Sequence, residues 1–115
     1  MNPPKNSSKP ARLKKRAEFL RASAARQRAV TPGFILQRAE ASTVRFGLTA
    51  TKKLGNAVAR NRARRRLRAL AEKLLASLAR PGDYVLIARE AVLTQSFADL
   101  EKDLEGALKK LSCLK

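Results

Sequence analysis

The 115-residue sequence has no histidine, no tryptophan and only one cysteine, Cys113. One cysteine cannot form a disulfide within the chain, and without histidine or more cysteines a zinc site is effectively excluded. The sequence also has no glycine-rich phosphate loop, no histidine base and no plausible cysteine nucleophile. Any catalysis is therefore expected to come from another component of a complex.

Long apolar runs are missing too. No stretch approaches the about 20 apolar residues that a membrane-spanning helix needs. The N-terminus is polar and basic and lacks the apolar segment of a secretory signal, so a cytoplasmic location is expected. Acidic residues are few, and four near the C-terminus fit a helix surface better than a metal site. These are Asp99, Glu101, Asp103 and Glu105.

Positive charge dominates the sequence and is unevenly placed. The formal net charge is +17. Residues 1–68 hold 19 lysines and arginines against two acids, whereas residues 69–115 hold seven of each sign. Such an excess destabilises a compact chain by self-repulsion and is usually compensated by a nucleic acid or an anionic surface. One half of the protein is therefore expected to face a polyanion.

The N-terminal third predicts an arm followed by a helix. Residues 1–11, rich in proline, lysine and serine, are interpreted as a flexible basic arm, and residues 12–115 as a single domain. A helix is expected from Leu13 to about Arg28. Phe19 lies off its apolar stripe, either as an exposed aromatic or packed against a sheet. The predicted stripe consists of Leu13, Ala17, Leu20 and Ala24.

Two strands are predicted next. The turn at 31–33 precedes a strand over Phe34–Ala39, and a second strand covers Thr43–Thr51 with strict alternation. One face of the second strand is apolar and should point to the core. The other face could hold an extended strand of nucleic acid, although an ordinary solvated sheet face is slightly favoured. The second face carries Thr43, Arg45, Gly47, Thr49 and Thr51.

A long helix follows, with Asn56 as its predicted N-cap and its end near Ala79. A helical wheel separates an apolar stripe from a polar arc, with Arg60 and Arg66 on the flanks. The stripe contains Ala59, Ala63, Leu67, Leu70, Leu74 and Leu78, widened by Ala71. The arc contains Asn61, Arg62, Arg64, Arg65 and Arg68. The stripe is expected to pack on the sheet, which leaves the arginines outside.

The remaining elements complete a β-α-β unit. The apolar run Tyr84–Arg89 is typical of a buried central strand, and its position after a strand and a long helix favours parallel pairing. A last amphipathic helix begins near Phe97 and has a solvated face of mixed sign. The predicted fold class is α+β, a single-domain α-β sandwich.

The segment from Lys52 to Arg68 is the strongest functional signal. It contains eight basic residues and no acid. The guanidinium group matches phosphate oxygens with a planar fork of donors, and a helix N-terminus adds unpaired N–H groups near Gly55. A merely solvated helix usually mixes charge signs, so it is disfavoured. The pattern indicates polyanion binding without separating RNA from DNA. A weaker basic patch lies on the first predicted helix. It is as consistent with a general attraction to anions as with a specific binding site.

The same segment, KKLGNAVARNRARRRLR, resembles the signature of the protein subunit of bacterial ribonuclease P, roughly Lys-Lys-x-Gly-x-Ala-Val-x-Arg-Asn-Arg-x-Lys-Arg-x-x-Arg. Supporting likeness lies in Arg12-Leu13, Glu18-Phe19, Pro32–Phe34, Arg45–Leu48 and Asp83–Arg89. The resemblance implies a sandwich like the second domain of ribosomal protein S5, with a left-handed β-α-β crossover. A non-catalytic ribosomal or ribosome-assembly RNA-binding protein is the alternative.

The resemblance also implies partners and chemistry. The family's partner is a catalytic RNA, one protein per RNA, and together they remove the 5′ leader from precursor tRNA. Mg²⁺ ions held by the RNA would perform the hydrolysis. The sequence departs from the family pattern at two positions. Ser23 stands where an aromatic residue is often found, and Gln37 stands where one is sometimes found. Both departures would weaken stacking on the leader.

The resemblance carries two sets of site residues over by position. The catalytic-RNA-binding set is Lys52, Lys53, Arg60, Asn61, Arg62, Arg64, Arg65 and Arg68. The leader-binding set is Phe19, Arg45, Thr49 and Thr51.

Overall fold

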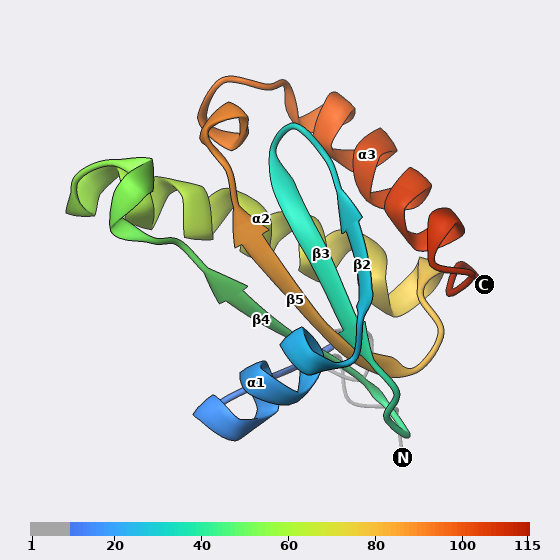
Figure 1. Ribbon diagram of the computed structural model, residues 1–115. Coiled ribbons are helices and arrows are strands. Elements are labelled where there is room, and N and C mark those ends of the chain that lie inside the picture. The colour runs from blue at the N-terminus through green and yellow to red at the C-terminus, as the bar shows by residue number, and fades with distance from the viewer. Residues whose placement is uncertain (1–9) are drawn as a thin grey trace, which may run out of the picture.

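The computed structural model describes residues 10–115, which form a five-stranded sheet with helices on both faces (Figure 1). The helices and strands are β1 (Ala11–Arg12), α1 (Arg16–Ala24), β2 (Gln27–Val30), β3 (Phe34–Ala39), β4 (Val44–Thr49), α2 (Ala57–Leu78), β5 (Gly82–Ala88) and α3 (Phe97–Lys110). Short 3-10 helices, η2 (Lys52–Leu54) and η3 (Glu90–Leu93), precede α2 and α3. Residues 1–9 of the predicted arm lie outside the described residues, and its last residue, Ala11, belongs to β1.

The strand order is β1-β4-β5-β3-β2. β4 and β5 pair in parallel, as the β-α-β pattern predicted, and β3 pairs antiparallel to β5. α2 and α3 cover one face of the sheet, and α1 lies against the other (Figure 1). The connection β4–α2–β5 is left-handed (Figure 1), an exception to the strong right-handed rule. The predicted α+β sandwich is therefore confirmed.

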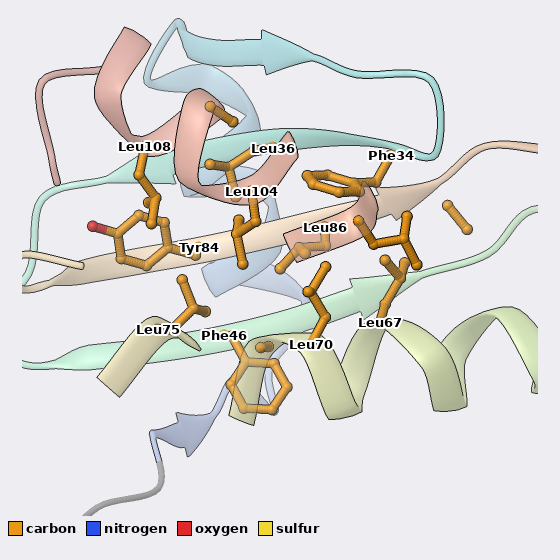
Figure 2. Packing of buried hydrophobic residues seen from close by; sticks show 14 of the residues in the cluster. Phe34, Leu36, Phe46, Leu67, Leu70, Leu75, Tyr84, Leu86, Leu104 and Leu108 are labelled. Atoms are coloured by element: carbon orange, nitrogen blue, oxygen red, sulfur yellow. The ribbon is translucent and has the colours of Figure 1, made fainter. Parts of the chain in front are cut away.

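The main core lies between the sheet and the helices α2 and α3. Alternate residues of β3 and β5 point into it, where they meet the apolar stripes of the two helices (Figure 2). Apart from tertiary packing, Asn56 stabilises the start of α2, because its Oδ1 accepts a hydrogen bond from the Ala59 N–H at 2.9 Å. The middle of the predicted α2 stripe is confirmed, since Ala63, Leu67, Leu70 and Ala71 are buried. Leu75 is buried in addition, whereas Ala59, Leu74 and Leu78 are only partly buried.

The first predicted helix was too long and its buried stripe was wrong. α1 ends at Ala24, Arg26 adopts a positive φ of 65°, and Gln27–Val30 pairs with β3 as an edge strand. Leu13 is buried but precedes the helix, whereas Ala17 and Ala24 are exposed and Leu20 is 55% exposed. The face that packs on the sheet instead carries Phe19 and Ala22. In an alanine-rich helix of nine residues, several stripes fit equally well and the sheet decides between them.

Candidate nucleic-acid interface

The N-terminal end of α2 is built to present positive charge. Gly55 has a φ of 145°, a backbone conformation that side chains disfavour, and it turns the chain from η2 into the Asn56 cap. This turn places Lys52 and Lys53, both exposed, just before the first unpaired N–H groups of the helix. The positive end of the helix dipole and the charges of the two lysines therefore lie at the same end of α2.

Asn61, Arg62, Arg64, Arg65 and Arg68 are all exposed on α2, and they are called the basic arc below. Arg60 and Arg66 are half-buried on its flanks, as the helical wheel predicted. Among residues 10–115, no ion pair involves an arginine of α2. The positive charge of the basic arc is thus left for an external anion.

Asn61 interacts with a neighbour on the same helix. Its Oδ1 accepts a hydrogen bond from Arg64 Nη1 at 3.1 Å. This contact orients the Arg64 side chain, and the amide N–H groups of Asn61 can still donate to an external acceptor. Arg60 is held in a similar way by the Gly55 carbonyl, at 3.1 Å.

Arg12 is a basic residue of this surface that was not among the predicted site residues. Its guanidinium carbon lies 5.0 Å from the centre of the Phe46 ring. Together with four residues of the basic arc and Leu48, it lines a pocket of about 320 Å³. β1 brings Arg12 there by pairing with β4. A strand of two residues has no detectable periodicity, so nothing in the sequence pattern placed Arg12 beside α2.

The predicted leader-binding residues lie on or near the other face of the sheet. The ring of Phe19 packs directly over Gly47 in the middle of β4, where an added Cβ would lie 2.5 Å from the ring. Phe19 is therefore partly buried against the sheet, and Gly47 is the residue that makes room for it. Thr49 follows on the same face of β4, and Thr51 is exposed beyond the strand.

Arg45 belongs to a network with three other charged residues, Glu18, Arg21 and Asp83, called the α1 clamp below. Asp83 lies opposite Arg45 in the β4–β5 register and is fully buried. Its carboxylate accepts hydrogen bonds from Arg45 Nε and Nη2, at 2.8 and 2.7 Å, and from Arg21 Nη2 at 2.5 Å. Arg45 Nη1 also donates to Glu18 at 2.8 Å. These bonds fasten α1 to the sheet.

Both acids of the α1 clamp have lowered pKa values. Burial raises the pKa of Asp83, but the hydrogen bonds from Arg45 and Arg21 outweigh burial and hold the pKa below its usual value. The pKa of Glu18 falls to about 2, mainly because its carboxylate accepts backbone N–H bonds from Lys15 and Lys14, with a smaller part from Arg45. Both carboxylates are therefore ionised at neutral pH.

Residues 10–115 contain no cluster of three histidine, cysteine, aspartate or glutamate side chains that could hold a metal ion. No helix within that range is long and apolar enough to cross a membrane.

Comparison with known proteins identifies the family. The family model described as Ribonuclease P matches residues 8–112. The chain belongs to the ribonuclease P protein family. It is 46% identical over 111 residues to the ribonuclease P protein component of Paramagnetospirillum magneticum, covering 90% of this chain and 84% of the relative. It is 47% identical over 105 residues to that of Caulobacter vibrioides, covering 88% and 70%.

Solved ribonuclease P proteins share the fold. The Staphylococcus aureus protein has a TM-score of 0.75 at 28% identity, over 93% of this chain and all of that one. The Thermotoga maritima protein has a TM-score of 0.73 at 22% identity, over 86% and 96%. The arrangement of sheet and helices is therefore that of the ribonuclease P proteins.

Proposed function

We propose that this chain is the RNA-binding subunit of ribonuclease P and helps a catalytic RNA to remove the 5′ leader from precursor tRNA. The observation that carries the proposal is the basic arc. It presents four exposed arginines without acidic partners among the described residues, on a helix that follows two more exposed cations in η2. Membership of the family supplies the RNA that such a surface would bind.

The basic arc would bind the catalytic RNA through its phosphates. Arginine donates two parallel hydrogen bonds to a phosphate and stays charged at any physiological pH. The residues proposed for this contact are Lys52, Lys53, Arg60, Asn61, Arg62, Arg64, Arg65 and Arg68, to which the pocket adds Arg12. The RNA would hold the Mg²⁺ ions that perform the hydrolysis, and the protein would bind and position the catalytic RNA and the leader.

The leader would contact the face of the sheet beside α1. Phe19 offers a partly exposed ring for stacking, and Thr49 and Thr51 offer hydroxyl groups. Arg45 is already bonded to two carboxylates and its side chain is only 30% exposed. Its contribution to leader binding would therefore come mainly from holding α1, and with it Phe19, in place.

Reconstitution with ribonuclease P catalytic RNA tests the proposal. Cleavage of precursor tRNA at low Mg²⁺ should rise when the protein is added, because bound arginines replace counterions along the RNA. A substrate without a leader separates leader binding from RNA docking. No gain in cleavage, together with co-purification with ribosomal subunits, would overturn the proposal in favour of a ribosomal or assembly protein.

A further inference from the structure

A pocket of about 430 Å³ lies beside the basic arc, between α2 and the start of α3. Its lining combines two kinds of surface. The ring of Phe97, the first residue of α3, and the side chain of Ala69 form an apolar part. The side chains of Arg62, Arg65 and Arg66 line the rest and bring positive charge to the pocket. The volume is within the range of about 300–1,000 Å³ typical of small-molecule sites.

The spacing along α2 explains the hollow. Arg62, Arg65, Arg66 and Ala69 follow the i, i+3, i+4, i+7 pattern that brings residues onto one helical face. Three long side chains on this face are followed by one methyl group. The short side chain at 69 leaves room that a longer residue would fill.

The walls of the pocket are held in place. Arg66 is half-buried, and its Nη1 donates a hydrogen bond to the Val92 carbonyl at 2.8 Å. At the Phe97 wall, the Lys73 ammonium lies 5.7 Å from the centre of the ring and forms an ion pair with Glu101 at 2.6 Å. The aromatic wall and one guanidinium are thus fixed before any ligand arrives. Arg62 and Arg65, by contrast, are exposed, and among the described residues the α2 arginines with side-chain hydrogen bonds are Arg60, Arg64 and Arg66.

We infer that this pocket takes one unstacked nucleotide of the catalytic RNA. The base would lie against Phe97 and Ala69, and its flanking phosphates would pair with Arg62 and Arg65. Aromatic rings and guanidinium planes are the surfaces on which single-stranded bases stack. No acidic residue lines the pocket, which fits an anionic ligand. The inference rests on the proposed function, since it assigns a subsite to the RNA that the basic arc would bind.

Filling the pocket without changing charge tests the inference. Ala69→Leu places a good helix former at an exposed position of α2, so folding should be retained. Affinity for the catalytic RNA should fall about tenfold, the order of effect expected for losing one stacked base. The salt dependence of binding should change little, because Arg62 and Arg65 keep their charge and can still pair with phosphates. Ala98→Leu, at an exposed position outside the pocket lining, is the matched control and should bind like the unmodified chain.

A fluorescence reporter provides a second readout that does not depend on filling the pocket. The sequence has no tryptophan, so Phe97→Trp introduces a single tryptophan into the aromatic wall, and it can be excited selectively over the one tyrosine. Saturating catalytic RNA should quench its emission and protect it from acrylamide. Both effects should be lost when Ala69→Leu is combined with it, and random RNA should produce neither.

The outcomes separate the two proposals. If the unmodified chain does not bind catalytic RNA in preference to random RNA, the proposed function fails. If it binds and assists cleavage, but Ala69→Leu binds equally well or the reporter does not respond to bound catalytic RNA, the pocket inference alone is overturned. An equal response to random RNA would also overturn it.

Discussion

The basic arc and the α1 clamp both consist largely of arginines, but the arginines play different roles in the two places. In the clamp, Arg45 and Arg21 donate to the buried carboxylate of Asp83, and Arg45 also pairs with Glu18. In the arc, four exposed arginines have no acidic partner among residues 10–115. Clamp arginines hold one helix on the sheet, whereas arc arginines remain available for a ligand.

The difference arises from which acids reach each surface. The arc faces away from the sheet on a helix segment that contains only arginines as charged residues. The clamp lies where β5 places Asp83 opposite Arg45, and where α1 brings Glu18 over the same spot. Whether an arginine is structural or ligand-binding therefore depends on tertiary pairing, and a positive charge in the sequence does not settle it.

Removing the buried carboxylate should have the largest effect. Asp83→Ala leaves two arginines without their shared partner. The free energy of unfolding should fall by about 3 kcal/mol, the lower end for broken buried pairs, because both arginines are partly exposed to water. Urea unfolding followed by circular dichroism measures it.

Glu105→Ala, which removes an exposed acid from α3, is the control and should change stability by less than about 0.5 kcal/mol. Equal stability of the two variants would show that the clamp contributes little and would remove the distinction between the two groups of arginines.

Arg62→Ala combined with Arg65→Ala should leave stability nearly unchanged and weaken binding of the catalytic RNA about 100-fold. This estimate assigns roughly 1.4 kcal/mol to each lost charge-assisted contact. The slope of log affinity against log salt should fall by about 1.5, from two lost phosphate contacts at roughly 0.7–0.9 each. Filter binding across a salt series measures both quantities.

A charge-matched control is available on α3. Lys109→Ala combined with Lys110→Ala removes the same net charge from exposed positions outside the basic arc. It should affect RNA affinity much less. A similar loss for both double variants would mean that the RNA responds to overall charge and not to the basic arc.

Acid should weaken the clamp with a smaller effect. The lowered pKa values of Glu18 and Asp83 contribute stability that is present above the ordinary carboxyl range, near pH 4. That stability should be lost as the pH falls from about 4.5 toward 2, through the folded pKa of Glu18. Unfolding measured at intervals over this range should decline steadily, and Glu18→Gln should flatten part of the decline. No change in the curve for Glu18→Gln would contradict the assigned role of this carboxylate.

Much of the fold was predictable because the longer elements have clear periodicity. The 22-residue α2, its Asn56 cap and the parallel strands around it followed from spacing and turn residues. The N-terminal region did not, since α1 has nine residues, β1 has two and β2 has four. Whether a short alanine-rich or mixed segment forms a helix or a strand depends on its contacts with the sheet. The local sequence pattern does not indicate these contacts.

The functional surfaces show the same division. The basic arc could be placed because every member lies on one continuous helix. The α1 clamp could not, since Asp83 lies 38 residues from Arg45 and 62 from Arg21. The contribution of Arg12, and the position of Phe97 beside Ala69, likewise depend on which elements meet, and neither has a signature in the sequence.

The position of Cys113 has a practical consequence for studying the protein. The thiol is 1% exposed, its Sγ contacts the Leu108 carbonyl at 3.5 Å, and the neighbouring Leu114 pairs with Ala79 at the end of α2. A thiol reagent can reach this sulfur only when the junction of α2 and α3 opens, that is, when the C-terminal residues 113–115 separate from the end of α2. Since the sequence contains no other cysteine, the rate of labelling would report the local opening of this junction in the unmodified protein. Measured with and without RNA, that rate would show whether binding at one end of α2 tightens the other.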